Sequence, residues 1–321
     1  MRAIKSVKQN YHPSETVLDL LECFRRMVND CIRIGLKENV TSLKSLSLRA
    51  YRQLSDYDVP SYYKLCAISN AVGILRNYRK AFRKNPSIGT PYAEKLILTT
   101  CYGFKIEGDV LRLPIGKRRY EEIPLNSHTK SVLSVPGHTS RSVFLNARAI
   151  SIAFTKETVE MNPRGLIGID RNLDNITVAS SSGDVKRLDL SRATEIKATY
   201  REVKSHFTRN DVRIGRRIFG KYGVKQRNKV GQILHHVSRE VVDQAKARNF
   251  GIVMENLKGL RKLYRRGNGQ GNKYRSRLNS WSFYELQRQI QYKARWDGIP
   301  VVYIPPQRTS STCAMCGSDV T

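Results

Sequence analysis

The sequence predicts an α+β protein of more than one domain. Three observations carry this prediction: the length of the chain, a change of hydrophobic period along it, and a mixture of strands and helices in its second half. At 321 residues the chain exceeds what one hydrophobic core usually spans. Hydrophobic residues make up 40% of it, which supplies packed cores and excludes a mainly disordered chain.

A helical segment interrupts the N-terminal β region. Residues 1–12 contain one short expected strand. From Ser14, an expected N-cap, apolar residues recur at three- and four-residue steps, as in an amphipathic helix. A second helical pattern follows Pro60 and ends in a cluster of Arg and Lys before the proline-containing loop 85–91. We therefore assign residues 13–87 to a helical insertion.

The hydrophobic period falls to two between residues 95 and 160. The segment KLILTTCYGFKIEGDVLRLPI is expected to form paired strands with a turn at Glu107-Gly108-Asp109. The β character continues in RSVFLNARAISIAFTKE. Residues 1–12 and 88–160 are therefore expected to form one small, barrel-like β domain that contains the helical insertion.

Strands and helices are mixed from residue 161 onward. Three short apolar segments predict a meander: Leu166–Ile169, Ile176–Ala179 and Val185–Leu190. Later segments predict an amphipathic helix over about 230–245, a buried strand at Phe250–Met254, a helix from about Trp281 to Asp297, and a strand at Val301–Ile304. The glycine-rich, basic segment 258–277 is predicted to be a loop. We assign 161–321 to an α/β domain.

The charge of the chain calls for a polyanionic partner. Lys and Arg number 57 against 27 Asp and Glu, which gives a net charge of +30. Nucleic acid fits best, because an acidic membrane face would favour one basic amphipathic helix over charge spread along the chain. No apolar run reaches the roughly 18 residues of a membrane helix. The six cysteines do not form a disulfide framework, so we expect a reducing, cytoplasmic location and no membrane partner.

Basic side chains in three segments are the expected contacts to nucleic acid. Arginine can grip phosphates with two hydrogen bonds, and interleaved aromatic rings can stack on unpaired bases. The residues assigned to this role are Arg76, Arg79, Arg83, Arg213, Arg216, Arg217, Lys225, Arg261, Lys262, Arg265, Arg266, Lys273 and Arg275.

Two acidic residues at strand ends are the expected catalytic pair. Asp170 follows the apolar run GLIGI, and Glu255 follows GIVM. Phosphodiester hydrolysis uses Mg²⁺ ions held by carboxylates, which must converge on one point. Each carboxylate alone fits a solvated strand end, but together in a strongly basic chain they favour a Mg²⁺ (or Mn²⁺) site. Asp174, nearby, fits a turn residue better than a ligand.

A second metal is indicated near the end of the sequence. Cys313 and Cys316 form a CxxC followed by glycine, which is typical of a zinc knuckle. A redox dithiol is the alternative, and the lack of a surrounding thioredoxin-like βαβ pattern favours zinc. Two thiolates make only half of a tetrahedral site, so we expect partial, weak zinc binding.

Three segments resemble those of a known family. In order they are GIDRNLDNITVASSSG, IVMENLKGL and LNSWSFYELQRQIQYKARWDGIPVVYIPPQRTSSTCAMCG, and they resemble the TnpB/OrfB proteins of insertion sequences, relatives of type V CRISPR effector nucleases. The resemblance is strong over 164–317 and architectural over 1–160. It implies an RNase H-like RuvC nuclease domain, an N-terminal wedge domain with a helical recognition insertion, and a zinc ribbon, here expected to start at 305–321. It also implies RNA-guided cleavage of double-stranded target DNA, with a guide RNA derived from the transposon end, in a prokaryotic nucleoid.

The resemblance assigns roles to particular residues. Asp170 and Glu255 match the first two acids of the family's catalytic triad, and Cys313 and Cys316 match its first zinc pair. The family pattern continues with a second CxxC and a third Asp, which this sequence lacks, so we expect a C-terminally truncated form. A nuclease-deficient RNA-guided DNA-binding protein, acting as a repressor, is therefore one alternative. A strand-transferring transposase that joins DNA ends is another.

Overall fold

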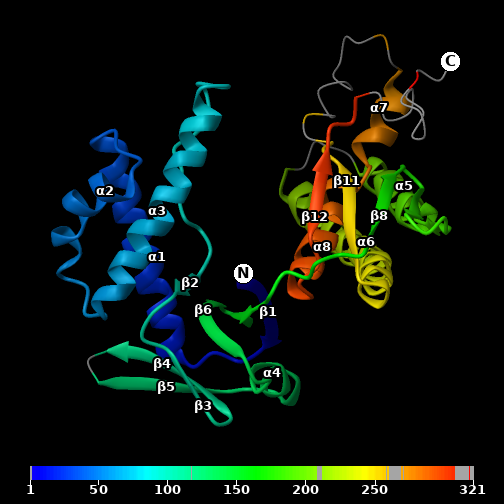
Figure 1. Cartoon of the computed structure of the whole chain (residues 1–321). Helices are drawn as coiled ribbons and strands as arrows, with labels where there is room; N and C mark the ends of the chain where they lie inside the picture. Colours follow the sequence, from blue (N-terminus) through cyan, green and yellow to red (C-terminus); the bar gives the residue numbers. More distant parts are fainter. Residues whose placement is uncertain are drawn as a thin grey trace. The chain divides into compact units, whose positions relative to one another are not determined.

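The chain divides into two compact units, Arg2–Lys156 and Glu157–Thr321. The structure is a computed structural model, and Figure 1 labels most of its helices and strands. It describes residues 2–116, 118–207, 212–257, 259, 269, 271–307 and 318.

Three α-helices lie between residues 14 and 83 of the first unit. They are α1 (Glu15–Lys37), α2 (Leu43–Ala50) and α3 (Ser61–Phe82), with a short 3₁₀ turn at Arg52–Leu54. Ser14 caps α1, because its side-chain oxygen accepts a hydrogen bond from the backbone N–H of Val17 at 3.2 Å. Helices α1 and α3 pack together along faces that bury Phe24 and Leu75. The two long helices and the cap confirm the sequence prediction, whereas α2 was not predicted.

The strands of the first unit form two separate hydrogen-bonded sheets, where the sequence predicted one barrel-like domain. A four-stranded sheet has the order β1-β7-β6-β2, and a three-stranded sheet has the order β3-β4-β5. The strands are β1 (Arg2–Asn10), β2 (Ile97–Thr100), β3 (Lys105–Glu107), β4 (Val110–Gly116), β5 (Arg119–Pro124), β6 (His138–Asn146) and β7 (Ala149–Glu157), with α4 (Ser127–Leu133) between β5 and β6. The predicted turn at Gly108 joins β3 to β4, and its φ of 55° is one that glycine adopts without strain.

Buried polar side chains join the parts of this unit. Gln9 on β1 donates to the carbonyl of Pro124 at 2.8 Å and accepts from the N–H of Asn126 at 3.0 Å. Tyr63 on α3 is fully buried, and its hydroxyl donates to the carbonyl of Pro114 at 2.8 Å. The N-terminal strand and the helices are thus each fastened to the β4–β5 hairpin or its end.

A five-stranded sheet forms the centre of the second unit. Its order is β10-β9-β8-β11-β12, with bounds β8 (Gly165–Arg171), β9 (Asn175–Ser180), β10 (Val185–Asp189), β11 (Phe250–Glu255) and β12 (Val301–Ile304). Strands β8, β9 and β10 pair antiparallel, which confirms the predicted meander. Strand β11 lies between β8 and β12 and pairs parallel with both. The carboxyl ends of β8, β11 and β12 therefore meet at one edge of the sheet.

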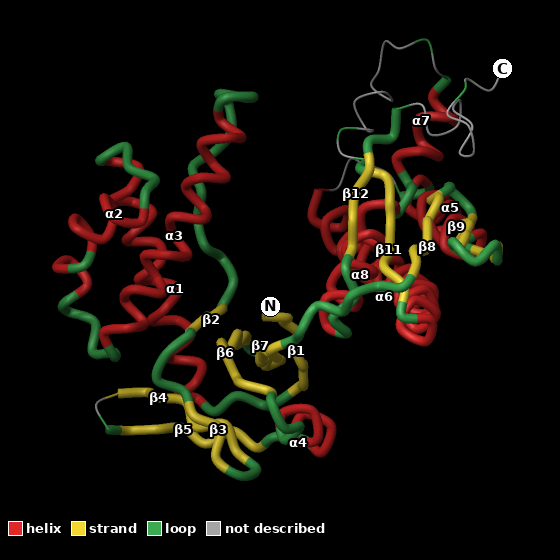
Figure 2. The backbone as a smooth tube through the Cα atoms, viewed as in Figure 1, coloured by secondary structure: helices red, strands yellow, loops and turns green. Residues whose placement is uncertain are grey.

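Helices cover one face of this sheet, as the backbone tube shows (Figure 2). They are α5 (Ser191–Ser205), α6 (Val212–Arg248) and α8 (Phe283–Trp296), and a further helix, α7 (Asn272–Asn279), buries none of its residues. The core contains Ile169 and Met254 from the strands, Leu234 and Val241 from α6, and Ile290 from α8. Outward-facing positions of the sheet do not belong to this core.

The helices differ from the sequence prediction in three places. Helix α6 has 37 residues, far more than the predicted helix at 230–245, because its N-terminal half is too polar for a regular apolar stripe. Helix α5 was not predicted for the same reason. Residues 272–279 were assigned mostly to a basic loop, but they form α7. None of the described helices is both long enough and apolar enough to cross a membrane.

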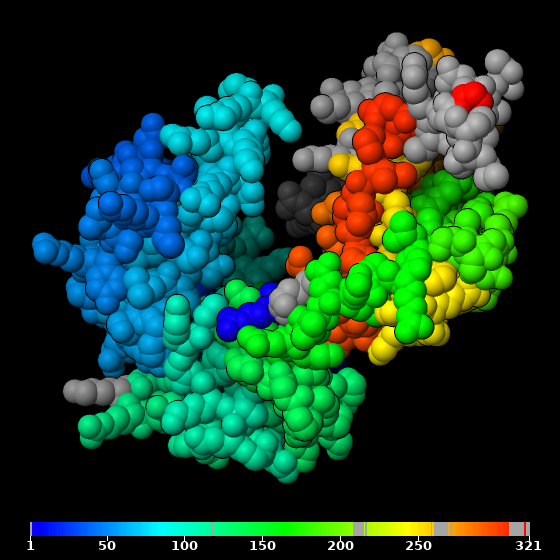
Figure 3. Space-filling view, in the orientation of Figure 1, coloured from blue at the N-terminus to red at the C-terminus, as the bar shows by residue number. Residues whose placement is uncertain are grey.

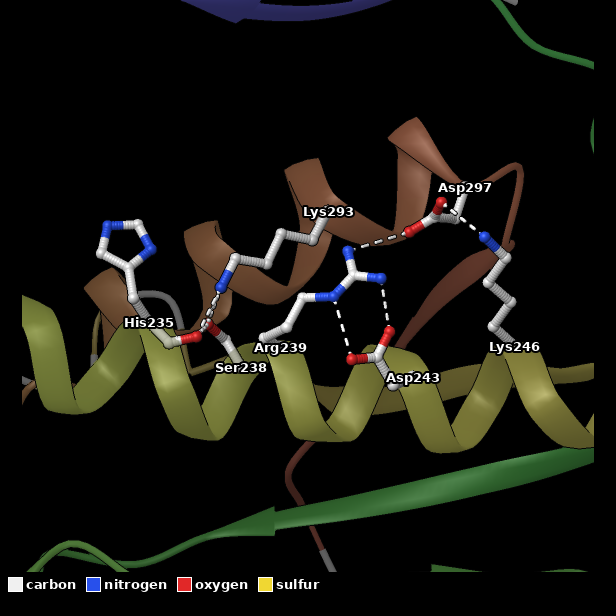
Figure 4. Close-up of polar contacts among 7 residues, drawn as sticks. All are labelled: His235, Ser238, Arg239, Asp243, Lys246, Lys293 and Asp297. Carbon is white, nitrogen blue, oxygen red and sulfur yellow. Dashed lines mark hydrogen bonds and ion pairs between the residues drawn. The ribbon is translucent and has the colours of Figure 1, made fainter. Parts of the chain in front are cut away.

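Polar contacts fix α6 against α8 (Figure 4). The buried ammonium of Lys293 on α8 donates to the carbonyl of His235 at 2.6 Å and to the hydroxyl of Ser238 at 2.7 Å. At the end of α8, Asp297 accepts from Arg239 and Lys246, each at 3.2 Å. These contacts set the position of both helices beneath the sheet.

Candidate active site

Asp170 and Glu255 lie at matching positions on neighbouring parallel strands. The last registered pair between β8 and β11 is Ile169 with Met254. Asp170 and Glu255 are the next residue on each strand, and they pair outward with Thr177 on β9 and Ile304 on β12. The sequence predicted that the two acids end strands of similar depth, and the register brings them side by side at the carboxyl edge.

Both acids occupy the face of the sheet opposite the helical core. Successive strand residues point to opposite faces, and their neighbours Ile169 and Met254 are buried in the core. Asp170 is accordingly exposed and Glu255 half-buried. On the same face of the sheet, Val302 of β12 is 52% exposed. The space-filling view shows β12 in orange-red at the surface beside β11 in yellow (Figure 3). The carboxylates therefore stand on an accessible face.

Arg171 connects the two strand ends from the core side. Its side chain is 3% exposed, and its guanidinium donates to the carbonyl of Glu255. It also donates to Gln287 Oε1 at 2.7 Å and to the carbonyl of Phe283 at 3.3 Å, both on α8. Burial lowers the pKa of Arg171, and the Tyr303, Glu255 and Asp170 side chains act in the opposite direction. A buried cation thus lies directly behind the carboxylate pair.

The loop after β8 orders the surroundings of Asp170. The amide of Asn172 donates to Asp170 Oδ2 at 3.0 Å. Asp174 lies in the turn between β8 and β9, where it forms a 2.7 Å ion pair with Arg277 of α7. Its carbonyl accepts from the N–H of Leu190 at 2.7 Å. Asp174 therefore serves the turn and the docking of α7.

The side chains of Asp170 and Glu255 are of the chemical type that binds hard divalent cations. Asp170 and Glu255 offer carboxylate oxygens, which Mg²⁺ and Mn²⁺ prefer. Within the part of the chain that the structure describes, no group of three His, Cys, Asp or Glu side chains is placed to hold a metal ion. The geometry thus places two carboxylates on paired strand ends.

The predicted nucleic-acid contacts fall into three groups. In the first unit, Arg76 donates to the carbonyl of Thr41 at 3.0 Å, and Arg79 donates to Asn39 Oδ1 at 2.7 Å. These two arginines therefore also hold the turn between α1 and α2, while Arg83 is exposed at the end of α3.

The second group lies in the other unit. Arg217 and Lys225 are exposed on α6, and Lys273 is exposed on α7. Arg275 on α7 is half-buried and donates to Asn272. Arg213 and Arg216 belong to α6.

The remaining predictions lie outside the described residues. They comprise the basic residues Arg261, Lys262, Arg265 and Arg266 and the zinc pair Cys313 and Cys316. These assignments stay predictions.

Comparison with known proteins finds similar sequences in one family. Residues 283–321 match the family model of the Cas12f1-like TNB domain. The TnpB-like protein MJ0751 of Methanocaldococcus jannaschii is 29% identical over 228 residues, which are 67% of this chain and 81% of that protein. The CRISPR-associated endodeoxyribonuclease Cas12f1 of Sulfoacidibacillus thermotolerans is 38% identical over 85 residues, 26% of this chain and 18% of that protein. These matches support the TnpB and Cas12f family for this chain.

The structure agrees with this assignment at the level of the fold. The chain is similar to the protein in a Cas12f1–sgRNA–target DNA complex, with a TM-score of 0.63 at 14% identity. The likeness covers 95% of this chain and 75% of that one. The mixed α and β fold expected from the TnpB resemblance is therefore confirmed.

Arg171 is a residue beside the two carboxylates that the sequence reasoning missed. A usable signal was present, because Ile167, Ile169 and Arg171 alternate with period two. A charged residue in that series must face the core, where it needs several hydrogen-bond acceptors.

Proposed function

We propose that this protein is an RNA-guided DNA endonuclease of the TnpB type, with a RuvC-like active site at Asp170 and Glu255. One observation carries the proposal: the two acids lie side by side on an accessible face, at the carboxyl ends of adjacent parallel strands. The strand order β10-β9-β8-β11-β12, with an antiparallel meander followed by two parallel strands, supports an RNase H-like domain. The proposal that RNA is the guide and DNA is the substrate comes from the names and structures of the similar proteins.

The two carboxylates would hold Mg²⁺ or Mn²⁺ against the scissile phosphate. When bound, the metal supplies activation of water and stabilisation of the leaving oxygen. The backbones of Asp170 and Glu255 are held in place, because each residue lies on a strand that is paired with a neighbouring strand on both sides. Arg171 holds the Glu255 backbone from behind, and Asn172 orients one oxygen of Asp170. Hydrolysis then joins a water oxygen to phosphorus and breaks the bond from phosphorus to a sugar oxygen.

The nucleic-acid partners would be a guide RNA derived from the transposon end and a double-stranded DNA target. The net charge of +30 supplies the long-range attraction that such polyanions need. A protein with these partners would act at the prokaryotic nucleoid. Cys313 and Cys316 would supply two thiolates to a zinc ion, and metal analysis of a Cys313→Ser variant against the unchanged chain tests that part of the proposal.

Replacing either carboxylate tests the active site. We expect Asp170→Ala and Glu255→Ala to abolish Mg²⁺-dependent cleavage of guide-matched DNA while RNA binding stays intact. Asp184→Ala is the matched control, because Asp184 is an exposed acid of the same unit that pairs with Arg248 at 2.7 Å. Full cleavage by either of the first two variants contradicts the assignment.

A nuclease-deficient RNA-guided DNA-binding protein is the second candidate. The observation that favours it is that the described residues bring only two acidic side chains to this strand edge without a third metal ligand. Stable binding of guide-matched DNA without cleavage would support this candidate. Joined DNA ends among the products would instead support the strand-transfer alternative.

A further inference from the structure

Two free cysteines of the first unit belong to elements that contact each other. Cys66 lies on α3 and is half-buried, and Cys101 is exposed directly after the end of β2. Helix α3 and strand β2 are in contact within this unit. The pair therefore connects the helical insertion with the four-stranded sheet, although the two positions are far apart in the sequence.

The turn that follows β2 lies against the face of α3 that carries Cys66. Gly103 in this turn has a φ of 79°, and a side chain there would collide with the ring of Tyr62 on α3. Tyr62 and Cys66 are four residues apart in the helix, so their side chains share one face, one turn apart. The close approach at Gly103 thus brings the turn to this face of the helix.

The backbone around Cys101 is held in place at this contact. The hydroxyl of buried Thr100 donates to the carbonyl of Tyr102 at 2.7 Å and accepts from the N–H of the same residue at 3.1 Å. Burial raises the pKa of the Cys66 thiol, a hydrogen bond with the backbone of Cys101 lowers it, and the neighbouring Cys101 thiol raises it. The Cys66 sulfur therefore lies at the main chain of Cys101, and the two thiols are neighbours.

We propose that Cys66 and Cys101 form a reversible disulfide when the protein meets hydrogen peroxide. The exposed Cys101 sulfur attacks one oxygen of the peroxide, the O–O bond breaks, and Cys101 becomes a sulfenic acid as water leaves. The Cys66 sulfur then attacks the Cys101 sulfur, the S–O bond breaks, and a second water leaves with the thiol proton as the S–S bond forms. The two thiols lose two electrons and two protons, and the peroxide is reduced to two waters. A thiol reductant restores both cysteines by exchange.

The positions of the two sulfurs give each a separate role in this reaction. Cys101 is exposed, so it meets the oxidant first, and half-buried Cys66 closes the bond. Cys31 on α1 is fully buried, and burial raises the pKa of its thiol to about 12, so it does not compete. The disulfide fastens α3 to the end of β2 in the arrangement that the structure has. This inference does not depend on the proposed nuclease function.

The test is peptide mapping of the folded protein after exposure to hydrogen peroxide, with the remaining thiols blocked by N-ethylmaleimide before digestion. Trypsin places Cys66 in the peptide 65–76 and Cys101 in the peptide 96–105. We expect a linked pair that is lighter by two hydrogen atoms than the two peptides together and that disappears with dithiothreitol. The oxidised protein should melt about 5–10 °C above the reduced one. Cys23→Ser is the control, because it removes a half-buried thiol of α1 and should leave the linked pair unchanged.

A second measurement separates the two steps. In Cys66→Ser the sulfenic acid at Cys101 has no thiol to close on, so dimedone should label Cys101 more strongly there than in the unchanged chain. Equal labelling of Cys101 in both proteins, without a linked pair, would overturn the proposal. A link from Cys101 to any other cysteine, a link found only between two chains on a non-reducing gel, or two cysteines that stay reduced would contradict it as well. The mapping uses the unchanged chain, so this result stands even where a variant does not fold.

Discussion

The guanidinium of Arg171 donates a hydrogen bond to the main-chain carbonyl of Glu255, so the residue after one expected catalytic acid holds the strand end that carries the other. The same side chain reaches Gln287 and Phe283 of α8. Three elements therefore meet at one planar group, which has the fixed geometry that lysine lacks. This arrangement ties the backbone at Glu255 to the strand that carries Asp170 through the side chain of Arg171.

We predict that Arg171→Lys impairs cleavage through metal binding. The ammonium keeps the charge but cannot make three hydrogen bonds in the same directions, so Glu255 loses its fixed position. Loss of residues that orient metal ligands typically costs about 10- to 100-fold in metal affinity or activity. Titrating Mg²⁺ in a cleavage assay should show a raised half-saturating concentration, with guide RNA affinity unchanged.

The control for this prediction is Arg288→Lys, an exposed arginine on α8 that pairs with Glu285 at 2.7 Å. It should leave the Mg²⁺ titration unchanged. An Arg171→Lys protein that cleaves normally at every Mg²⁺ concentration would show that the hydrogen bond to Glu255 has no role in positioning.

Asp297 should be important for stability rather than for activity. Its side chain is 8% exposed and accepts from both Arg239 and Lys246 (Figure 4). Asp297→Asn removes the charge that both cations share, and we expect a loss of about 1–3 kcal/mol in the free energy of unfolding. Asp243→Asn should cost less, about 0–1 kcal/mol, because Asp243 is 52% exposed and its ion pair is screened by water. Urea denaturation of the two variants measures the difference.

Tyr11 should make the first unit sensitive to high pH. Burial raises the pKa of the Tyr11 hydroxyl from 10.0 to about 12, and the hydroxyl donates to the carbonyl of Asn146 at 2.9 Å. The unfolded chain therefore loses this proton first as the pH rises. The stabilisation is complete below about pH 10 and is lost between about pH 10 and 12. Urea unfolding across this range should show a smaller decline for Tyr11→Phe than for the unchanged chain, and identical declines would contradict the pKa shift.

The parts of the fold that the sequence predicted are those with regular apolar periodicity. Strand segments such as Phe250–Met254 and the capped helix that begins after Ser14 have strong local signals, and the structure confirms them. Helix α5 and the first half of α6 lack such a signal because most of their residues are polar. Helix α7 buries none of its residues, so only its contacts to the rest of the unit, such as Arg277 with Asp174, identify its place.

The sequence predicted the two acidic residues of the candidate site but not the residues that surround them. Asp170 and Glu255 each follow an apolar strand, and parallel strands place their carboxyl ends together. The direction of β11 relative to β8 and its place between β8 and β12 are set by tertiary packing. The contacts of Arg171 depend on that packing, because its partners Phe283, Gln287 and Glu255 are 112, 116 and 84 residues away in the sequence.

The arginines of α3 should separate RNA binding from stability. Arg83 is exposed at the end of the helix, so Arg83→Gln should weaken RNA binding and leave the melting temperature unchanged. The slope of log K against log salt should become shallower by the equivalent of about one phosphate contact. Arg79 donates to Asn39 Oδ1 at 2.7 Å and to Thr41 Oγ1 at 3.2 Å, so Arg79→Gln should also lower the free energy of unfolding by about 1–2 kcal/mol. Arg148→Gln is the charge-matched control, because Arg148 is exposed between β6 and β7, outside the predicted RNA contacts. RNA affinities and melting temperatures of the three proteins decide the matter: if Arg83→Gln binds RNA as Arg148→Gln does, the end of α3 is a solvated surface and not an RNA contact.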